Sequence, residues 1–142
     1  MWKYEQLMAK YDNINIVESN NMPYFLPGII IHGKIFINKN LSPKRKHEVL
    51  SEEIAHHLIT YGNILNQDIH NNRRFEWYAR RLGYRIAIPF EEIIDLYNQN
   101  VTSIHEMAEH FEVTEKYMID AYNHYRLKKG IPLLPEAKSI FF

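Results

Sequence analysis

The fold is decided by residues 28–61, which read GIIIHGKIFINKNLSPKRKHEVLSEEIAHHLITY. Two β-branched runs flank Gly33, and glycine supplies the positive φ that a tight turn needs. Residues Gly28–Asn38 are therefore predicted to form a hairpin. A helix is expected to follow over 43–61, with Ser42 as its N-cap and a proline in its first turn, where the missing N–H removes no hydrogen bond.

The elements outside this stretch follow from hydrophobic periodicity and from the positions of proline and glycine. They are an N-terminal helix (Met1–Tyr11), a short strand (Asn15–Val17), a polar loop (Gly62–Asn72) and four helices (Arg73–Ala87, Glu91–Asn98, Ile104–Phe111 and Glu115–Lys128). The sum is an α+β protein with a small N-terminal antiparallel sheet and a helical C-terminal part. Its length predicts a single domain, 1–142, in which 103–129 form a helix-turn-helix-like subregion.

Composition restricts the chemistry. The 142 residues include 17 basic and 17 acidic side chains, and a net charge of zero argues against nucleic acid as a partner. There is no cysteine, so any metal must be bound by His, Asp or Glu, and the eight histidines need an explanation. The sequence shows neither a targeting signal nor an apolar run long enough for a membrane span, and we expect a cytoplasmic protein that does not bind membranes.

The helix over 43–61 carries one candidate metal-binding face. Successive helical residues turn by about 100°, so Glu52 and His56 lie about 40° apart and Glu53 lies about 100° from Glu52. This arrangement is typical of zincin helices, in which two ligands at i and i+4 stand beside a glutamate base. Paired glutamates near a histidine are also common on solvated helix faces. Here the helix is apolar nearly all round, and buried carboxylates need a cation or hydrogen bonds.

The other histidines fit a metal site less well. His47 begins a His-Glu pair, but its i+4 residue is a serine, and we expect an exposed or hydrogen-bonded histidine. His105 and His110 are five residues apart and so about 140° apart around a helix, which is too far to chelate one ion. His57 faces away from the candidate site but could orient a ligand from behind. Surface or core positions are expected for the rest: His32, His70 and His124.

At this point the sequence resembles the ImmA/IrrE metallopeptidases, which are zinc-dependent and often encoded by phages and mobile elements. The first matching motif is Ser51-Glu52-Glu53-Ile54-Ala55-His56-His57, after an apolar run. The second signature of that family reads E-x-x-A-N-x-F-A-x-x-L-L-M-P. It is matched in register by Glu76, Ala79, Leu82, Ile86, Ala87, Ile88 and Pro89, with Gly83 at the second alanine and Arg80 in place of the asparagine.

The resemblance implies a zincin-like helix and a metal site. His56 and Glu76 would be metal ligands, and Glu53 would be the catalytic base. Glu52 matches the first histidine ligand of the family only by position and is assigned as a variant third ligand. His57, Tyr61 or Tyr78 could stabilise the transition state or support a ligand, and the sequence does not choose among them.

The glutamate at position 52, in place of a histidine ligand, alters the expected metal chemistry. Two glutamates and one neutral histidine bring a charge of −2 to the ion, so the ion acidifies its water less and weaker or lost activity is expected. More oxygen ligands also reduce selectivity, so zinc is the expected ion and manganese or iron remain alternatives. The implied activity is metal-assisted hydrolysis of a peptide bond in a protein substrate, such as a helix-turn-helix repressor of a phage or mobile element.

Two other functions compete with this interpretation. A non-catalytic module that binds and sequesters a repressor would use the same fold without cleavage. A DNA-binding regulator is suggested by 104–114 and the helix after it, which resemble half of a helix-turn-helix. Against DNA binding, that second helix begins with acidic Glu115 and Asp120, whereas base or phosphate contacts require donors.

Overall fold

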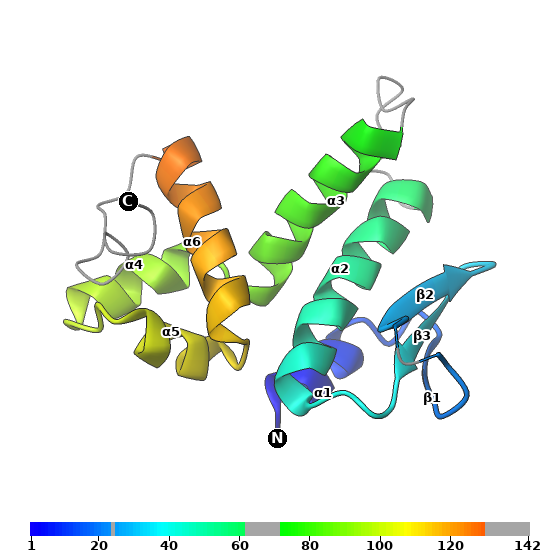
Figure 1. Ribbon diagram of the computed structural model, residues 1–142. Coiled ribbons are helices and arrows are strands. Elements are labelled where there is room, and N and C mark those ends of the chain that lie inside the picture. Colours follow the sequence, from blue (N-terminus) through cyan, green and yellow to red (C-terminus); the bar gives the residue numbers. More distant parts are fainter. Residues whose placement is uncertain (24, 62–71, 130–142) are drawn as a thin grey trace.

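The computed structural model describes residues 1–23, 25–61 and 72–129 (Figure 1). Within these ranges it contains six helices and a three-stranded sheet, which gives an α+β fold. In chain order the elements are α1 (Lys3–Lys10), β1 (Ile16–Ser19), β2 (Gly28–Ile31), β3 (Lys34–Asn38), α2 (Pro43–Tyr61), α3 (Asn72–Ala87), α4 (Phe90–Asn98), α5 (Ile104–Phe111) and α6 (Glu115–Lys129).

The predicted hairpin is confirmed, and its turn uses two residues with positive φ. Ile31 pairs with Lys34, while His32 and Gly33 adopt φ values of 51° and 78°. This left-handed pair matches the right-handed twist of the flanking strands, which is why two-residue hairpins favour it.

The prediction of an antiparallel sheet is wrong for the first strand. β1 pairs parallel to β3, with Ile16 opposite Ile35, so the strand order is β1-β3-β2 and the sheet is mixed. The reason lies in strand direction: the chain reverses between β1 and β2 and again at the hairpin, so β1 and β3 run the same way. β1 lies beside β3, and neighbouring strands that run the same way pair in parallel.

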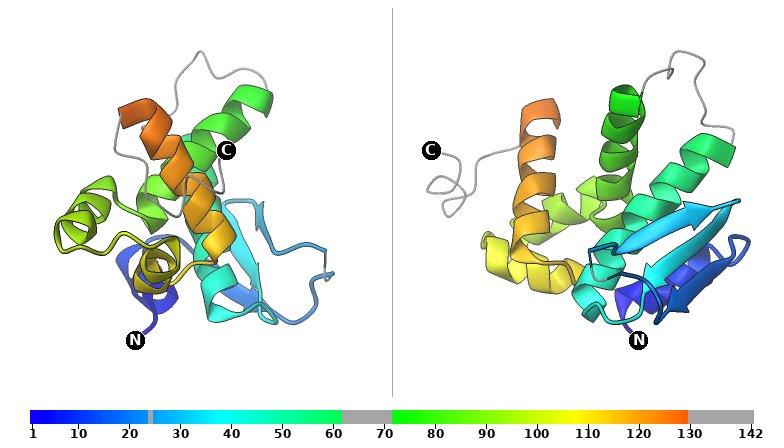
Figure 2. Two further views of the ribbon diagram at one scale, coloured as in Figure 1. Left: turned by 60° about the vertical axis from the view of Figure 1, so that its left-hand side comes forward. Right: turned by 45° about the vertical axis from the view of Figure 1, so that its right-hand side comes forward.

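One hydrophobic core joins α1, the sheet and α2 (Figure 2). Its buried members are Tyr4, Leu7, Ile14, Ile35, Ile37, Val49, Leu50 and Ile54. Helix α2 begins as predicted, because Oγ of Ser42 accepts the backbone N–H of Arg45 at 3.3 Å. Its apolar face therefore packs on the sheet, while its other side remains free for α3.

Helix α3 runs beside α2 in the opposite direction, and the two form the centre of the molecule (Figure 1). Ala55, Ile59 and Ala79 are buried between them. Because α2 and α3 are both regular helices, side chains on their facing surfaces come together in pairs.

The C-terminal helices pack into a second core with the end of α3. Its buried residues are Tyr84, Ala87, Ile88, Ile93, Leu96, Ile104, Met107, Ala108, Phe111, Val113, Met118, Ala121, Tyr122 and Tyr125. The hydroxyl of Tyr125 on α6 donates to the backbone carbonyl of Ile88 at 2.9 Å. This bond ties α6 to the turn between α3 and α4.

The expected helices agree with the structure to within two residues at each end, as fraying ends allow. His47 is buried and its Nδ1 lies 3.2 Å from the carbonyl oxygen of Glu112, so it is the hydrogen-bonded histidine of the two alternatives. The expected loop after Tyr61, with His70, lies outside the described residues. No helix among those described is both long and apolar enough to cross a membrane.

Candidate metal centre

The facing surfaces of α2 and α3 bring together the histidine and the distant glutamate of the two sequence motifs. Nε2 of His56 lies 3.6 Å from Oε2 of Glu76, across the interface between the helices. The ring of Phe75 stacks on the imidazole of His56, with centroids 5.3 Å apart and an interplanar angle of 29°. The stacking restrains the imidazole while its Nε2 faces the carboxylate.

Glu53 lines the same pocket as these two residues. The pocket has a volume of about 380 Å³ and is lined by Gly28, Ile29, Ile30, Glu53, His56, Thr60, Tyr61, Phe75 and Glu76. Burial raises the pKa of Glu53 from 4.5 to about 7, and repulsion from Glu52 and Glu76 adds to the effect. A carboxyl group with a pKa near 7 exchanges a proton readily at neutral pH, which is what a general base requires.

Gly28 allows this glutamate to lie under the sheet. A Cβ at Gly28 would stand 3.3 Å from Cγ of Glu53 and closer still to Val49. At Gly28, strand β2 therefore covers Glu53 with backbone alone, and the carboxylate is partly removed from water. This close approach is one physical source of the burial that raises its pKa.

Glu52 is directed to a different neighbour. Its Oε1 lies 3.9 Å from Nε of Arg80, and its side chain is 38% exposed. The absence of a side chain at Gly83 allows α3 to approach Glu52, because an added Cβ would meet its Cα and Cγ at 3.4 Å. Glu52 and Arg80 thus form a second pair across the interface, one helical turn from the pair of His56 and Glu76.

The donor types fit a divalent ion, but in this arrangement they do not surround one. In the described parts of the chain, no three His, Asp or Glu side chains form a group able to hold a metal. His56 and Glu76 converge, whereas the carboxylate of Glu52 faces a guanidinium. An imidazole with carboxylates from two helices is nevertheless a normal donor set for zinc, manganese or iron.

The three candidates for an additional donor have different positions. Tyr61 is exposed and lines the pocket, and the ring of His57 lies 4.9 Å from it between centroids. Nδ1 of His57 is buried without a hydrogen-bond partner among the described residues. Tyr78 instead packs edge-on against Trp77, at 5.1 Å between ring centroids, and is not among the pocket residues.

The sequence alone did not assign Gly28, Phe75 or Arg80 to the site. An assumed antiparallel arrangement of α2 and α3 would have predicted the positions of Phe75 and Arg80. If His56 faces Glu76, Phe75 must lie beside that histidine, and the residue one turn after Glu76 must face the residue one turn before His56. Gly28 has no comparable signal, because a glycine at a strand end does not reveal which helix it contacts.

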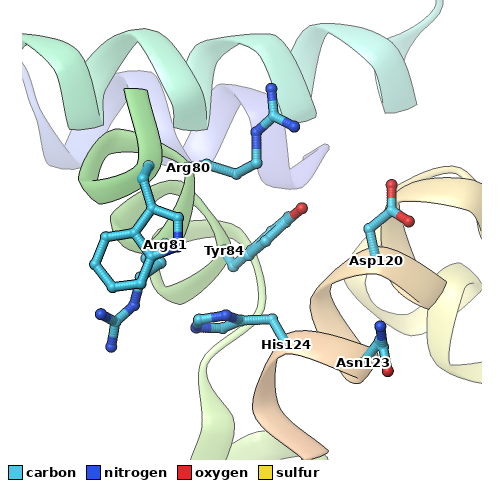
Figure 3. A pocket seen from close by; sticks show the side chains of 7 residues that line it. Arg80, Arg81, Tyr84, Asp120, Asn123 and His124 are labelled. Carbon is cyan, nitrogen blue, oxygen red and sulfur yellow. The ribbon is translucent and has the colours of Figure 1, made fainter. Parts of the chain in front are cut away.

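Arg80 also borders another pocket, between α3 and α6 (Figure 3). This pocket has a volume of about 320 Å³ and is lined by Trp77, Arg80, Arg81, Tyr84, Asp120, Asn123 and His124. The guanidinium of Arg80 rises toward the ribbon of α2, whereas the hydroxyl of Tyr84 points toward Asp120 (Figure 3). On its α3 side, Arg81 packs over the ring of Trp77 at 4.3 Å from its centroid.

Comparison with known proteins assigns the chain to a family. The family model of the M78 peptidases, described as the IrrE N-terminal-like domain, matches residues 10–119. The chain belongs to this family. Both motifs of the sequence, on α2 and α3, fall within the matched M78 region. The resemblance to the ImmA/IrrE metallopeptidases is therefore confirmed at the level of the family.

A solved structure has a fold similar to that of this M78 domain. A transcriptional regulator of Mycobacterium tuberculosis is similar, with a TM-score of 0.62 and 15% sequence identity. The match covers 82% of this chain and 39% of that regulator. At this identity it shows a shared fold, and it shows that the fold here spans well under half of the regulator. No curated protein sequence matches the chain.

Proposed function

We propose that this protein is a metal-dependent endopeptidase of the ImmA/IrrE type, and that zinc is its metal. The observation that supports this most is the placement of Glu53 beside His56 and Glu76 in one pocket, with a pKa raised to about 7. His56 and Glu76 would hold the ion, and rotation of the half-exposed Glu52 would provide a third donor. When bound, such an ion polarises a carbonyl group and acidifies water, which is the chemistry that amide hydrolysis needs.

Glu53 then carries the proton transfers. Its carboxylate accepts a proton from the attacking water and delivers it to the nitrogen of the leaving amine as the peptide bond breaks. Partial burial and the nearby carboxylates of Glu52 and Glu76 raise the pKa of Glu53 in the metal-free protein, which favours its uptake of a proton. Tyr61 lines the pocket and is the best placed of the candidate donors to a developing oxyanion.

The sheet offers a means of positioning an extended peptide. In the strand order β1-β3-β2, one edge of β2 has no strand beside it among the described residues. Gly28, Ile29 and Ile30 of this strand line the pocket that holds Glu53. A substrate segment added along this edge would be bound by main-chain hydrogen bonds, with its backbone carried past the catalytic carboxylate. A cytoplasmic helix-turn-helix repressor of a phage or mobile element is the substrate class that the family resemblance favours.

One observation favours a second function, in which the protein holds a repressor without cutting it. Glu52 is paired with Arg80, and the described residues present no group of three metal-binding side chains. A protein with this site could keep the peptide-binding edge and lose the ion. DNA binding has less support, because the N–H of Thr114 at the start of α6 already donates to Glu48 at 2.6 Å and is not available to a phosphate.

The test is cleavage of the repressor encoded beside the gene, with zinc and after removal of metal by a chelator. We expect cleavage only with metal, loss of cleavage in Glu53→Gln with metal content retained, and loss of bound zinc in Glu76→Ala. Glu106→Gln, an exposed carboxylate on α5, is the matched control and should cleave normally. Cleavage that persists in Glu53→Gln would exclude the proposed base. Stable binding of the repressor without cleavage, unaffected by chelator, would support the holding function instead.

A further inference from the structure

The pairing of Glu52 with Arg80 determines how this centre can acquire a metal, if the proposed function is correct. The pair of His56 and Glu76 and the pair of Glu52 and Arg80 are successive contacts along the same interface between α2 and α3. His56 and Glu76 could both bind a metal ion, because an imidazole and a carboxylate can each donate an electron pair. The pair of Glu52 and Arg80 already contains a positive charge, since arginine stays protonated at any pH a protein tolerates.

Arg80 is placed to compete for the same carboxylate as the metal. It follows Glu76 by four residues, so the two lie on one face of α3, one turn apart. Its Nε is 3.9 Å from Oε1 of Glu52, and its guanidinium rises toward the ribbon of α2 (Figure 3). Glu52 is not among the residues that line the pocket with His56 and Glu76, in agreement with a carboxylate drawn to this guanidinium.

The two departures from the family signature are thus in contact with each other. Position 52 carries a carboxylate where the signature has a histidine ligand, and position 80 carries a guanidinium where it has an asparagine. Glu52, Glu53 and Glu76 bring three carboxylates to this part of the interface, and neighbouring like charges repel. Arg80 therefore stabilises the metal-free form at the same carboxylate that the metal would need.

We propose that Arg80 is a positioning residue that holds Glu52 away from the metal and so weakens metal binding. Metal uptake then requires an exchange, in which Glu52 leaves Arg80 and turns toward His56 and Glu76. Exposed ion pairs of this kind contribute modestly, so the effect on affinity is on the order of two- to fivefold. The exchange also makes affinity depend on salt, because screening weakens the ion pair.

The test is the dissociation constant for Zn²⁺, measured by competition with a chromophoric chelator. We expect Arg80→Asn to bind Zn²⁺ about two- to fivefold more tightly than the unchanged protein, with the difference shrinking at high salt. Arg80 is 63% exposed in its side chain, so this variant should fold. Arg81→Asn is the matched control, because Arg81 is the neighbouring arginine on α3 and packs over Trp77, and it should leave the constant unchanged.

A second comparison separates competition for Glu52 from simple repulsion between Arg80 and the metal. In the Glu52→Ala background there is no carboxylate to release, so Arg80→Asn should have little further effect. An equal gain in both backgrounds would overturn the proposal, as would an equal gain from Arg81→Asn. A second readout is thermal: Arg80→Asn should lower the Tm of the metal-free protein and increase the rise in Tm on adding Zn²⁺.

Failure of the proposed function has a different signature. If neither the unchanged protein nor the double variant Glu52→His with Arg80→Asn takes up Zn²⁺, the site is not a metal centre and both proposals are wrong. If Zn²⁺ binds and Glu76→Ala abolishes binding, while Arg80→Asn does nothing, the metal centre stands and only the role of Arg80 is excluded.

Discussion

The carboxylate of Glu48 on α2 accepts two hydrogen bonds from Thr114, which lies 66 residues further along the chain, just before α6. Its Oε1 receives the backbone N–H at 2.6 Å and the hydroxyl at 2.5 Å, and its Oε2 pairs with Arg45 at 2.7 Å. Glu48 is only 2% exposed. One buried side chain thus joins the helix of the candidate centre to the C-terminal helices.

Replacement of Glu48 should destabilise the whole protein. Glu48→Ala removes a buried carboxylate and leaves the partly buried N–H of Thr114 without its acceptor, and we expect a loss of about 1–3 kcal/mol in the free energy of unfolding. The measurement is chemical denaturation of the metal-free protein. Glu109→Ala is the control, because that carboxylate pairs with Lys44 on the surface and its removal should change little. Equal stability of Glu48→Ala and the unchanged protein would show that the contact does not join the two parts.

The buried His47 should make stability depend on pH. Burial lowers its pKa from 6.5, against the opposing effect of its hydrogen bond to the carbonyl oxygen of Glu112. The unfolded chain therefore takes up the proton first as pH falls below about 6.5, and stability falls until the folded protein is protonated as well. His47→Gln should reduce the loss of stability at acid pH, measured as Tm at a series of acid pH values. His110→Gln, which replaces an exposed histidine, should not change this loss. If the pH profile of Tm is the same in His47→Gln as in the unchanged protein, His47 is not its source.

The ionised carboxylate of Glu53 should destabilise the metal-free protein. Its pKa is raised from 4.5 to about 7, so the folded state binds the proton more tightly than the unfolded state. Stability from this group falls as pH rises from about 4.5 to about 7 and stays low above that, by on the order of 2–3 kcal/mol. Glu53→Gln should therefore be more stable than the unchanged protein at alkaline pH, with little difference under acid conditions, in denaturation with chelator present. A constant difference at all pH values would mean that the carboxyl group is not perturbed.

Gly28→Ala should disturb the site through the approach of β2 to α2. The new Cβ would lie 2.7 Å from Cγ1 of Val49, so the strand must move, and overpacking of this kind costs about 1–3 kcal/mol. We expect lower stability and a larger loss of cleavage than of zinc binding, because the strand positions the substrate whereas the ligands are on the helices. Adding Val49→Ala creates room and should restore part of both. If the double variant is no better than the single one, the contact with Val49 is not the cause.

Much of the local structure was predictable because it depends on neighbours in the chain. The two β-branched runs around Gly33 predicted the hairpin, and Ser42 with the proline after it predicted the start of α2. The spacing of Glu52, Glu53 and His56 on one helix is fixed by helical geometry, so the candidate residues could be named without any tertiary contact. Their sequence pattern also carried the family resemblance.

Tertiary structure decided which of these side chains face one another. β1 pairs with β3 and not with β2, and nothing within β1 records that choice. The partner of Glu52 is Arg80 rather than His56 because α3 runs antiparallel to α2 and brings its own charges to the interface. Sequence spacing fixes angles around one helix, whereas the electrostatic balance of a site is set by the charges that a second helix places within a few ångströms of it.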